Sequence, residues 1–183
     1  MDRQSALAAV EANVKNRNLI KHMLATEAVM RALARRMGGD EEEWALAGLL
    51  HDIDVELTNG DMSRHSRTGA EMARQLGAGE AVVKAILCHN EAHGIKPETD
   101  IEKALFCTDP LTGLITAVAL VRPDKKLASV EPKSVTKRFK EARFAAGVNR
   151  DIIDTCTNIG LTREEFVAIG LDAMKGIAGE LGL

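Results

Sequence analysis

The sequence predicts an all-α, single-domain helical bundle of roughly eight or nine helices. Apolar residues recur at steps of about three to five in almost every segment, which is the spacing of an amphipathic helix. No segment shows the strict alternation of a strand, and no repeat or long linker divides the chain. Its 183 residues are enough for one well-buried core. We therefore expect one domain over residues 1–183.

The first expected helix runs from Leu19 to Met37 and carries an apolar stripe on one face. Gly38-Gly39 ends this helix, and Asp40 is a suitable N-cap for the next one. That second helix contains Trp44 and leads directly into His51-Asp52. A polar segment from Thr58 to Arg64 follows, which predicts a loop.

Three helices are expected in the middle of the chain. One begins at Ser63 or Ser66 and ends at Leu76, before two glycines, and another covers Glu80 to Asn90. A long apolar helix follows from Ile101 to about Val121. Pro110 interrupts it, and because proline lacks a backbone N–H, we expect a kink or a restart there.

The C-terminal third contains three further amphipathic segments. They cover about Pro132 to Ala146, Arg150 to Asn158, and Thr162 to Leu181. Thr162 and Glu165 have the spacing of a capping box, which fixes the start of the last helix. We expect a motif-bearing core over about 15–121 and a C-terminal helical extension over about 122–183.

Composition restricts the class of protein and the partners. The chain is 45% hydrophobic and 28% charged with a net charge of −3, and it has four Phe, one Trp and no Tyr. These averages predict no nucleic-acid polymer as a partner. No run of about 18 apolar residues is present, so no membrane span is expected. Three scattered cysteines indicate reduced thiols in a cytoplasmic protein, and the oligomeric state cannot be read from the sequence.

All five histidines lie between residues 22 and 93. His22 lies within a helix, His51 is followed by Asp52, and His65 and His89 lie at helix ends. Asp109 interrupts an apolar run, and a buried carboxylate is costly unless it is paired or coordinated. Imidazole and carboxylate groups together form the ligand set of Zn, Fe, Mn, Co or Ni. Taken singly, each histidine could instead be structural or could interact with a helix terminus.

The order His, His-Asp, Asp resembles the HD superfamily of metal-dependent phosphohydrolases, in its HDIG-like form. Residues 21–28 (KHMLATEA) and 48–53 (GLLHDI) resemble the helix of the first histidine and the central motif. Residues 65–71 (HSRTGAE) and 85–90 (AILCHN) resemble the two additional histidine segments of the dinuclear branches. One of those branches splits symmetrical dinucleoside tetraphosphates. The resemblance covers residues 15 to about 115.

The resemblance implies one or two divalent transition metals per chain. His22, His51, Asp52 and Asp109 would bind the first metal, and His65 and His89 the second, with Asp52 bridging the two. It also implies a phosphohydrolase in which a metal-activated water attacks a phosphoester or phosphoanhydride. The expected substrate is a small phosphorylated molecule, such as a nucleotide or dinucleotide.

The chain departs from the family pattern after the central motif. Many members continue as His-Asp-Ile-Gly-Lys, whereas this chain has Asp54 and Glu56 in that region. Asp54 is a candidate catalytic acid, and Glu56 is expected to be solvated. His93 follows His89 by four residues, so it either binds substrate, or supports the metal ligands, or belongs to a surface loop.

Residues 122–150 contain nine basic and three acidic residues. This segment is either a solvated helix face or a cover that supplies phosphate-binding cations, of which Lys133 and Arg138 are candidates.

Two other functions fit the same residues. Histidines and carboxylates around two irons also suit a di-iron oxygenase, and a non-enzymatic nucleotide-binding or ligand-binding module would retain the same fold.

Overall fold

The computed structural model describes all of residues 1–183, and every regular element in it is helical. The α-helices are α1 (Arg3–Asn13), α2 (Arg17–Met37), α3 (Glu41–Leu50), α4 (Val55–Thr58), α5 (Arg67–Gln75), α6 (Glu80–Cys88), α7 (Asp100–Leu120), α8 (Pro132–Arg138), α9 (Arg150–Asp154), α10 (Arg163–Gly176) and α11 (Ala178–Leu181). Three short 3₁₀ helices are η1 (Glu91–His93), η2 (Leu127–Ser129) and η3 (Thr155–Ile159). The all-α prediction is confirmed.

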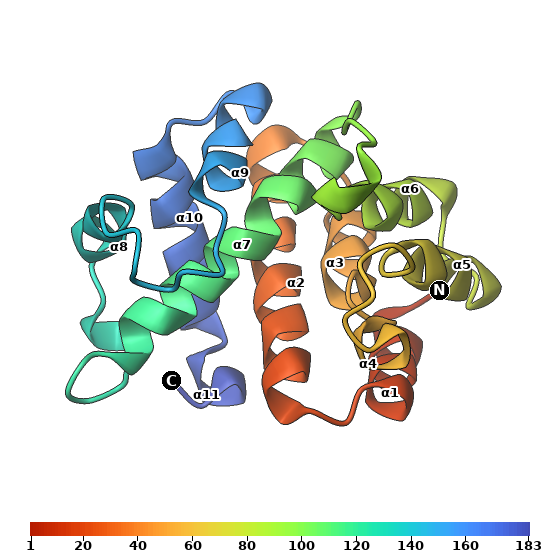
Figure 1. The fold of residues 1–183 in the computed structure, drawn as a ribbon, viewed down its shortest axis with the longest axis horizontal. Helices are drawn as coiled ribbons and strands as arrows, with labels where there is room; N and C mark the ends of the chain where they lie inside the picture. Colours follow the sequence, from red (N-terminus) through yellow and green to blue (C-terminus); the bar gives the residue numbers. More distant parts are fainter.

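Helix α7 is the centre of the fold. It runs diagonally across the molecule in Figure 1 and packs against α2, α6, α9 and α10. It is long and apolar enough to span a membrane, with a mean hydropathy of 1.3, so the expectation that no segment meets this criterion is wrong. However, 56% of that window is buried inside the structure, and core packing accounts for its apolar character.

Helices α2 and α3 form an antiparallel pair whose boundaries follow the expected signals. Gly38 ends α2 in the left-handed conformation, with φ of 75°. The Asp40 side chain accepts hydrogen bonds from the backbone N–H groups of Glu42 and Glu43 and caps α3. The sharp turn between the helices brings the His51 end of α3 beside the middle of α2.

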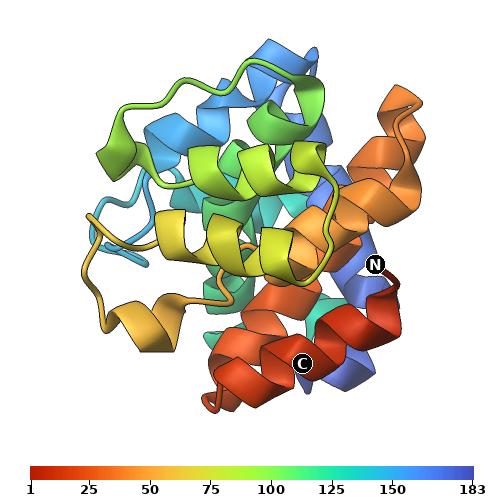
Figure 2. The same ribbon diagram turned by 90° about the vertical axis from the view of Figure 1, so that its right-hand side faces the viewer.

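Helices α5 and α6 lie side by side across one face of the molecule, as Figure 2 shows. Both end near the predicted residues, at Gln75 and Cys88. Pro110 does not restart α7, because this helix continues from Asp100 to Leu120.

Helix α1 was not predicted. Between the charged residues of this segment, Ala6, Val10 and Val14 recur every four residues and are fully buried. This narrow apolar stripe is sufficient for α1 to pack against its neighbour α3.

The C-terminal segments are shorter than expected. Helix α8 ends at Arg138 rather than near residue 146, and residues 139–149 form an irregular segment that crosses α7 in Figure 1. The Arg150 guanidinium holds this segment by donating hydrogen bonds to the carbonyl oxygens of Phe144, Ala145 and Val148. The capping box of Thr162 and Glu165 at the start of α10 is confirmed.

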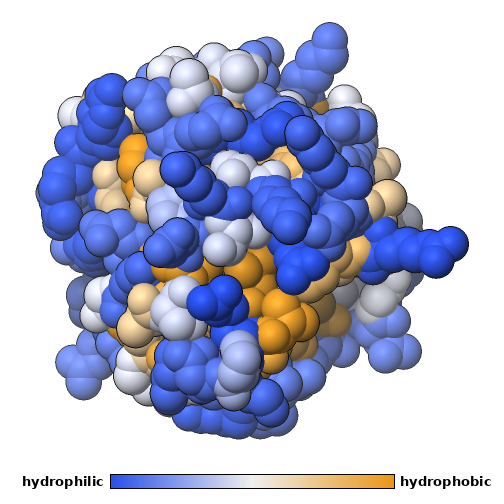
Figure 3. Space-filling model, turned by 90° about the vertical axis from the view of Figure 1, so that its left-hand side faces the viewer, coloured by the Kyte–Doolittle hydropathy of each residue, from blue (hydrophilic) through white to orange (hydrophobic).

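An apolar patch is visible among hydrophilic surface on the face in Figure 3. This view faces the end of the molecule that holds α8 and the C-terminal end of α7. Leu120 and Val121 are exposed there by 50% and 56%.

Candidate metal centre

Five segments of the chain meet at one cluster of histidines and carboxylates. His22 comes from the middle of α2, and His51 and Asp52 directly follow α3. His65 lies two residues before α5, His89 directly follows α6, and Asp109 lies in the middle of α7. The last two side chains reach the cluster because α6 packs against α7.

One half of the cluster contains His22, His51 and Asp109. The Nε2 atom of His22 lies 2.9 Å from Asp109 Oδ1 and 3.2 Å from the Nε2 atom of His51. Asp52 Oδ2 lies 3.5 Å from His51 Nε2 and 3.7 Å from His22 Nε2. These donor atoms converge closely enough to bind one metal ion.

The other half contains His65 and His89, on the opposite side of Asp52. Asp52 Oδ1 lies 3.4 Å from His65 Nε2 and 3.5 Å from His89 Nε2. The two oxygens of one carboxylate therefore face two different pairs of histidines. This is the arrangement of a carboxylate that can bridge two cations.

Backbone carbonyl groups set the ring orientation of two histidines. His51 Nδ1 lies 2.8 Å from the Gly48 carbonyl oxygen, and His89 Nδ1 lies 2.6 Å from that of Ile86. A carbonyl oxygen only accepts, so each Nδ1 carries the proton and donates it. The Nε2 atom of each ring therefore points a lone pair into the cluster, which is the orientation that a metal ligand needs.

Side chains orient the other two rings. His65 Nδ1 donates to Asp54 Oδ1 over 2.8 Å. His22 Nδ1 lies 3.0 Å from the Thr112 hydroxyl, which itself donates to the carbonyl oxygen of Asp109 over 2.9 Å. Because that hydroxyl has already used its proton, His22 Nδ1 is the donor. All four rings thus present an unprotonated Nε2 when neutral.

The donor set fits a divalent metal. The Nε2 atom of His89 is buried and has no hydrogen-bond partner, which is rare for a buried polar atom. The Nε2 atoms of His22 and His51 lie 3.2 Å apart, so a shared proton or a bound cation must lie between their lone pairs. Nitrogen and carboxylate oxygen are common ligands of divalent transition metals.

The charges in the cluster stabilise one another. Burial lowers the pKa of His51, but the charges of Asp52 and Asp109 outweigh it and raise that pKa to about 9. Burial raises the pKa of Asp52 and Asp109, and the neighbouring histidines outweigh this and hold both below the usual range. Both carboxylates are therefore ionised at neutral pH and available to a cation.

Asp54, which was expected to be a catalytic residue, lies behind His65 and does not line the cavity beside the cluster. Its carboxylate is fully buried and accepts hydrogen bonds from the backbone N–H groups of Ser66 and Gly69 as well as from His65 Nδ1. A Cβ atom at Gly69 would lie 3.1 Å from the Asp54 carboxyl carbon, so glycine leaves room for this contact. Asp54 is a positioning residue for His65.

We expect Asp54→Asn to weaken metal binding on the His65 side of the cluster about 10- to 100-fold, the usual effect of losing a group that orients a metal ligand. The asparagine side chain would place its N–H group against one of the N–H groups that now donate a hydrogen bond to Asp54. Metal titration against a chelating indicator measures the effect. Asp61→Asn is the control, because Asp61 is exposed and caps only Ser63. Equal affinity of both variants would contradict the assignment.

His93 lies near the cluster but is turned away from it. Its Nε2 atom lies 2.7 Å from the carbonyl oxygen of His65, to which it donates, and Nδ1 accepts from Arg67 Nε over 3.3 Å. Glu56 accepts hydrogen bonds from the backbone N–H groups of Lys15 and Asn16 and does not join the cluster. Both side chains therefore support the backbone around the site.

Lys133 and Arg138 are not brought to the cluster. They belong to α8, which packs against α10 and α7, and neither lines the cavity beside the metal ligands. Arg138 pairs with Glu141 and stacks on Phe144. The sequence did not indicate that α8 packs against α10 and α7, which places these two cations outside the site.

A cavity of about 220 Å³ opens beside the cluster and is lined by His65, His89 and Asp109. Gly147 and Asn149, from the end of the basic segment, form its far wall. The side chains of His22 and Asp109 are 22% and 32% exposed, whereas His51 is fully buried. A substrate would therefore approach from the His22 and Asp109 side.

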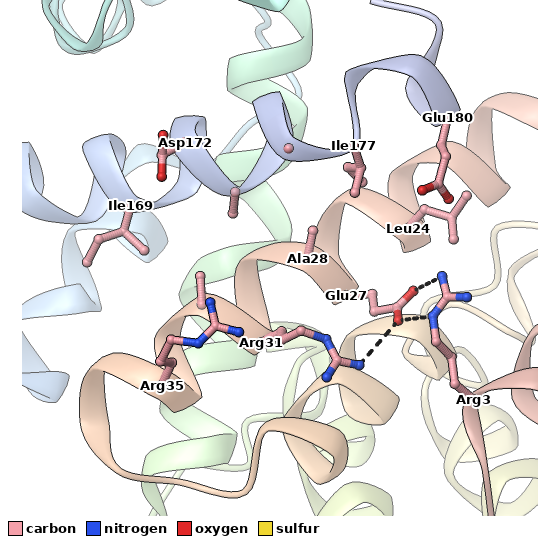
Figure 4. Close-up of a pocket in the computed structure, with 13 residues that line it drawn as sticks. Arg3, Leu24, Glu27, Ala28, Arg31, Arg35, Ile169, Asp172, Ile177 and Glu180 are labelled. Atoms are coloured by element: carbon pink, nitrogen blue, oxygen red, sulfur yellow. Dashed lines mark hydrogen bonds and ion pairs between the residues drawn. The ribbon is translucent and has the colours of Figure 1, made fainter.

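The largest cavity, of about 480 Å³, lies elsewhere, between α2, α10 and α11. Figure 4 shows Glu27 within it, held by Arg3 and approached by Arg31. Arg3 makes two hydrogen bonds to the Glu27 carboxylate, of 2.5 and 2.9 Å. This cavity has no histidine in its lining, so it lacks the imidazole ligands of the cluster.

Comparison with known proteins gives a consistent set of relatives. The model of the HD domain matches residues 19–128. Ribonuclease Y of a Sulfurovum species is 30% identical over 158 residues, which are 86% of this chain and 29% of the relative. Ribonuclease Y of a Nitratiruptor species is 35% identical over 145 residues, 74% of this chain and 26% of the relative. The chain thus spans less than a third of the length of these relatives.

These relatives overturn the expectation that no nucleic-acid polymer is involved, because they are ribonucleases by name. The expectation rested on a net charge of −3 and few aromatic residues over the whole chain. Such averages do not describe the residues that line a single cavity.

Proposed function

Because this chain belongs to the HD-domain family of metal-dependent hydrolases, we propose that it hydrolyses phosphoester bonds at the cluster described above. The proposed metal ligands share convergent donor atoms and burial: His22, His51, Asp52, His65, His89 and Asp109.

The position of Asp52 carries this proposal. Its two oxygens face separate histidine pairs at 3.4 to 3.7 Å, and the lone pair of His89 has no other partner. We infer two divalent metals per chain, with Asp52 between them. Fe, Mn, Zn, Co and Ni all accept this mixture of nitrogen and oxygen ligands.

Divalent metals, when bound, lower the pKa of a coordinated water and stabilise the charge that develops on phosphate oxygens. The chain's own residues supply the positioning. Hydrogen bonds from Nδ1 fix four imidazole rings, and Asp54 fixes His65. The partly exposed side of His22 and Asp109 leaves room for a phosphate.

We propose RNA as the first substrate class, in which a phosphodiester bond would be cleaved. The support comes from the ribonucleases that this chain resembles. Nucleotides and dinucleotides, with a phosphoester or phosphoanhydride bond, are the second class that the same chemistry would cleave.

The test combines metal analysis with hydrolysis. We expect close to two metals per chain after purification without chelator and close to one in His65→Ala. The chelated protein should release no product from bis(p-nitrophenyl) phosphate or from RNA, and Mn²⁺ or Fe²⁺ should restore cleavage. Dioxygen consumption without hydrolysis, or no metal after reconstitution, would overturn the proposal.

A further inference from the structure

Helix α7 exposes a single stripe, and the metal centre lies in the middle of it. Between Ile101 and Leu120 most side chains are buried, and those that are not recur every three or four residues along one face. The stripe consists of Lys103, Phe106, Asp109, Pro110, Gly113, Thr116, Ala117 and Leu120. A ligand bound at Asp109 can therefore extend along α7 without entering the core.

A second cavity, of about 430 Å³, lies along the N-terminal half of this stripe. Lys96, Lys103, Phe106, Thr155 and Asn158 are among its lining residues, and we name it the Phe106 cavity. Glu91 lines both this cavity and the one beside the metal ligands, so the two are neighbours. The Glu91 side chain, which is hydrogen-bonded to Asn149, lies at the boundary between them.

Phe106 is the one phenylalanine whose ring has no evident structural partner. Phe166 is fully buried in the core. The guanidinium groups of Arg163 and Arg138 cover Phe139 and Phe144, at 4.5 and 4.3 Å from the ring centroids. Phe106 is half-buried, as they are, but no guanidinium covers its ring, and it lines a cavity where a flat group can stack on it.

The charge in the Phe106 cavity favours an anion. Lys96 forms no ion pair, and Lys103 approaches only Asp100, at 4.0 Å. Glu91 is the one acid in the lining, and its carboxylate is held at the boundary by the Asn149 amide, at 3.2 and 3.4 Å. Thr155 and Asn158 add neutral hydrogen-bonding groups.

The spacing from the metal centre fits one nucleotide. Phe106 precedes Asp109 by three residues and Lys103 precedes it by six, so they lie about 5 Å and about 9 Å along the helix axis from this metal ligand. A base that flanks the reacting phosphate would meet Phe106 first, and the next phosphate would meet the two lysines.

We propose that the Phe106 cavity binds the nucleotide next to the scissile phosphate of single-stranded RNA. Phe106 stacks on the base, and Lys96 and Lys103 bind the following phosphate. This subsite rests on the proposed phosphodiesterase function and adds a polymer-specific contact that a small diester does not use.

The experiment compares RNA with a substrate too small to reach the cavity. Phe106→Leu keeps an apolar side chain towards the core, and Lys96→Ala/Lys103→Ala removes the two cations. Lys84→Ala/Lys126→Ala is the matched control, because both lysines are exposed and lie outside the cavity. The metal-loaded proteins are assayed with a single-stranded hexaribonucleotide and with bis(p-nitrophenyl) phosphate, and RNA binding is measured separately by fluorescence anisotropy.

We expect Phe106→Leu to weaken RNA binding and raise its KM about tenfold, the scale of one lost base–aromatic contact. The double lysine variant should reduce the slope of log K against log salt by about 0.7, the contribution of one phosphate contact on a single strand. Hydrolysis of the small diester should stay within about twofold in all variants.

Two results would overturn the subsite. One is RNA binding equal to that of the control, and the other is a parallel loss with both substrates, which would indicate a structural role. If the wild type hydrolyses neither substrate, the proposed function fails, whereas the anisotropy measurement still decides whether the cavity binds RNA.

Discussion

Asp52→Asn should reduce phosphodiester hydrolysis on the order of 10³-fold, the scale of losing a group that stabilises charge in a reaction. It should also lower the metal content to one or less per chain. The reason is that both Asp52 oxygens are engaged, Oδ2 with His22 and His51 and Oδ1 with His65 and His89. An amide supplies one neutral oxygen in their place. Elemental analysis and turnover of bis(p-nitrophenyl) phosphate measure the two effects.

The control for this prediction is Asp124→Asn. Asp124 is exposed and accepts hydrogen bonds from Ser129 and from the backbone of Lys126, far from the cluster in the chain. Its replacement should leave metal content and turnover unchanged. An Asp52→Asn protein that keeps two metals and wild-type turnover would exclude Asp52 as a shared ligand.

The sequence predicted which side chains would meet in the cluster. His22, His51, His65 and His89 were scarce residues in one half of the chain, and Asp109 interrupted an apolar run. Those are strong signals, because a buried charge needs a partner. The order of these residues along the chain already indicates which helices must converge.

The supporting contacts could not be predicted in the same way. Asp54 faces the backbone of Ser66 and Gly69 because the 59–66 turn folds back on it, with Ser66 at a φ of 66°. No local sequence pattern predicts that residues 59–66 fold back onto Asp54. Likewise, Lys133 and Arg138 were candidates because residues 122–150 are basic, but charge alone does not show where a segment lies, and neither residue lines the cavity beside the cluster.

The role of Phe106 was also difficult to predict from the sequence. Its position on the exposed stripe of α7 follows from the helical period, but the stripe can be identified only when the neighbours of α7 are known. The composition gives four phenylalanines, but it cannot distinguish the one that lines a cavity from the three that pack in the core or beneath an arginine.

Gly48→Ala should destabilise the protein by about 3 kcal/mol, because it overpacks the contact between α2 and α3. A Cβ atom at Gly48 would lie 2.8 Å from backbone atoms of Thr26 and Glu27, which cannot rotate away. For a chain of this size the melting temperature should fall by roughly 6 to 12 °C. Because His51 Nδ1 donates to the carbonyl oxygen of Gly48, the displaced helix should also weaken metal binding.

Gly176→Ala tests whether this loss is specific to the helix contact. Gly176 lies at the end of α10, and a Cβ atom there would meet nothing within 4 Å. Alanine also restricts the unfolded chain more than glycine, so this variant should be as stable as the wild type or slightly more stable. Thermal unfolding of the metal-free and metal-loaded forms separates packing from metal binding. If Gly48→Ala and Gly176→Ala had the same melting temperature, the close approach of α2 and α3 would not determine where His22 and His51 meet.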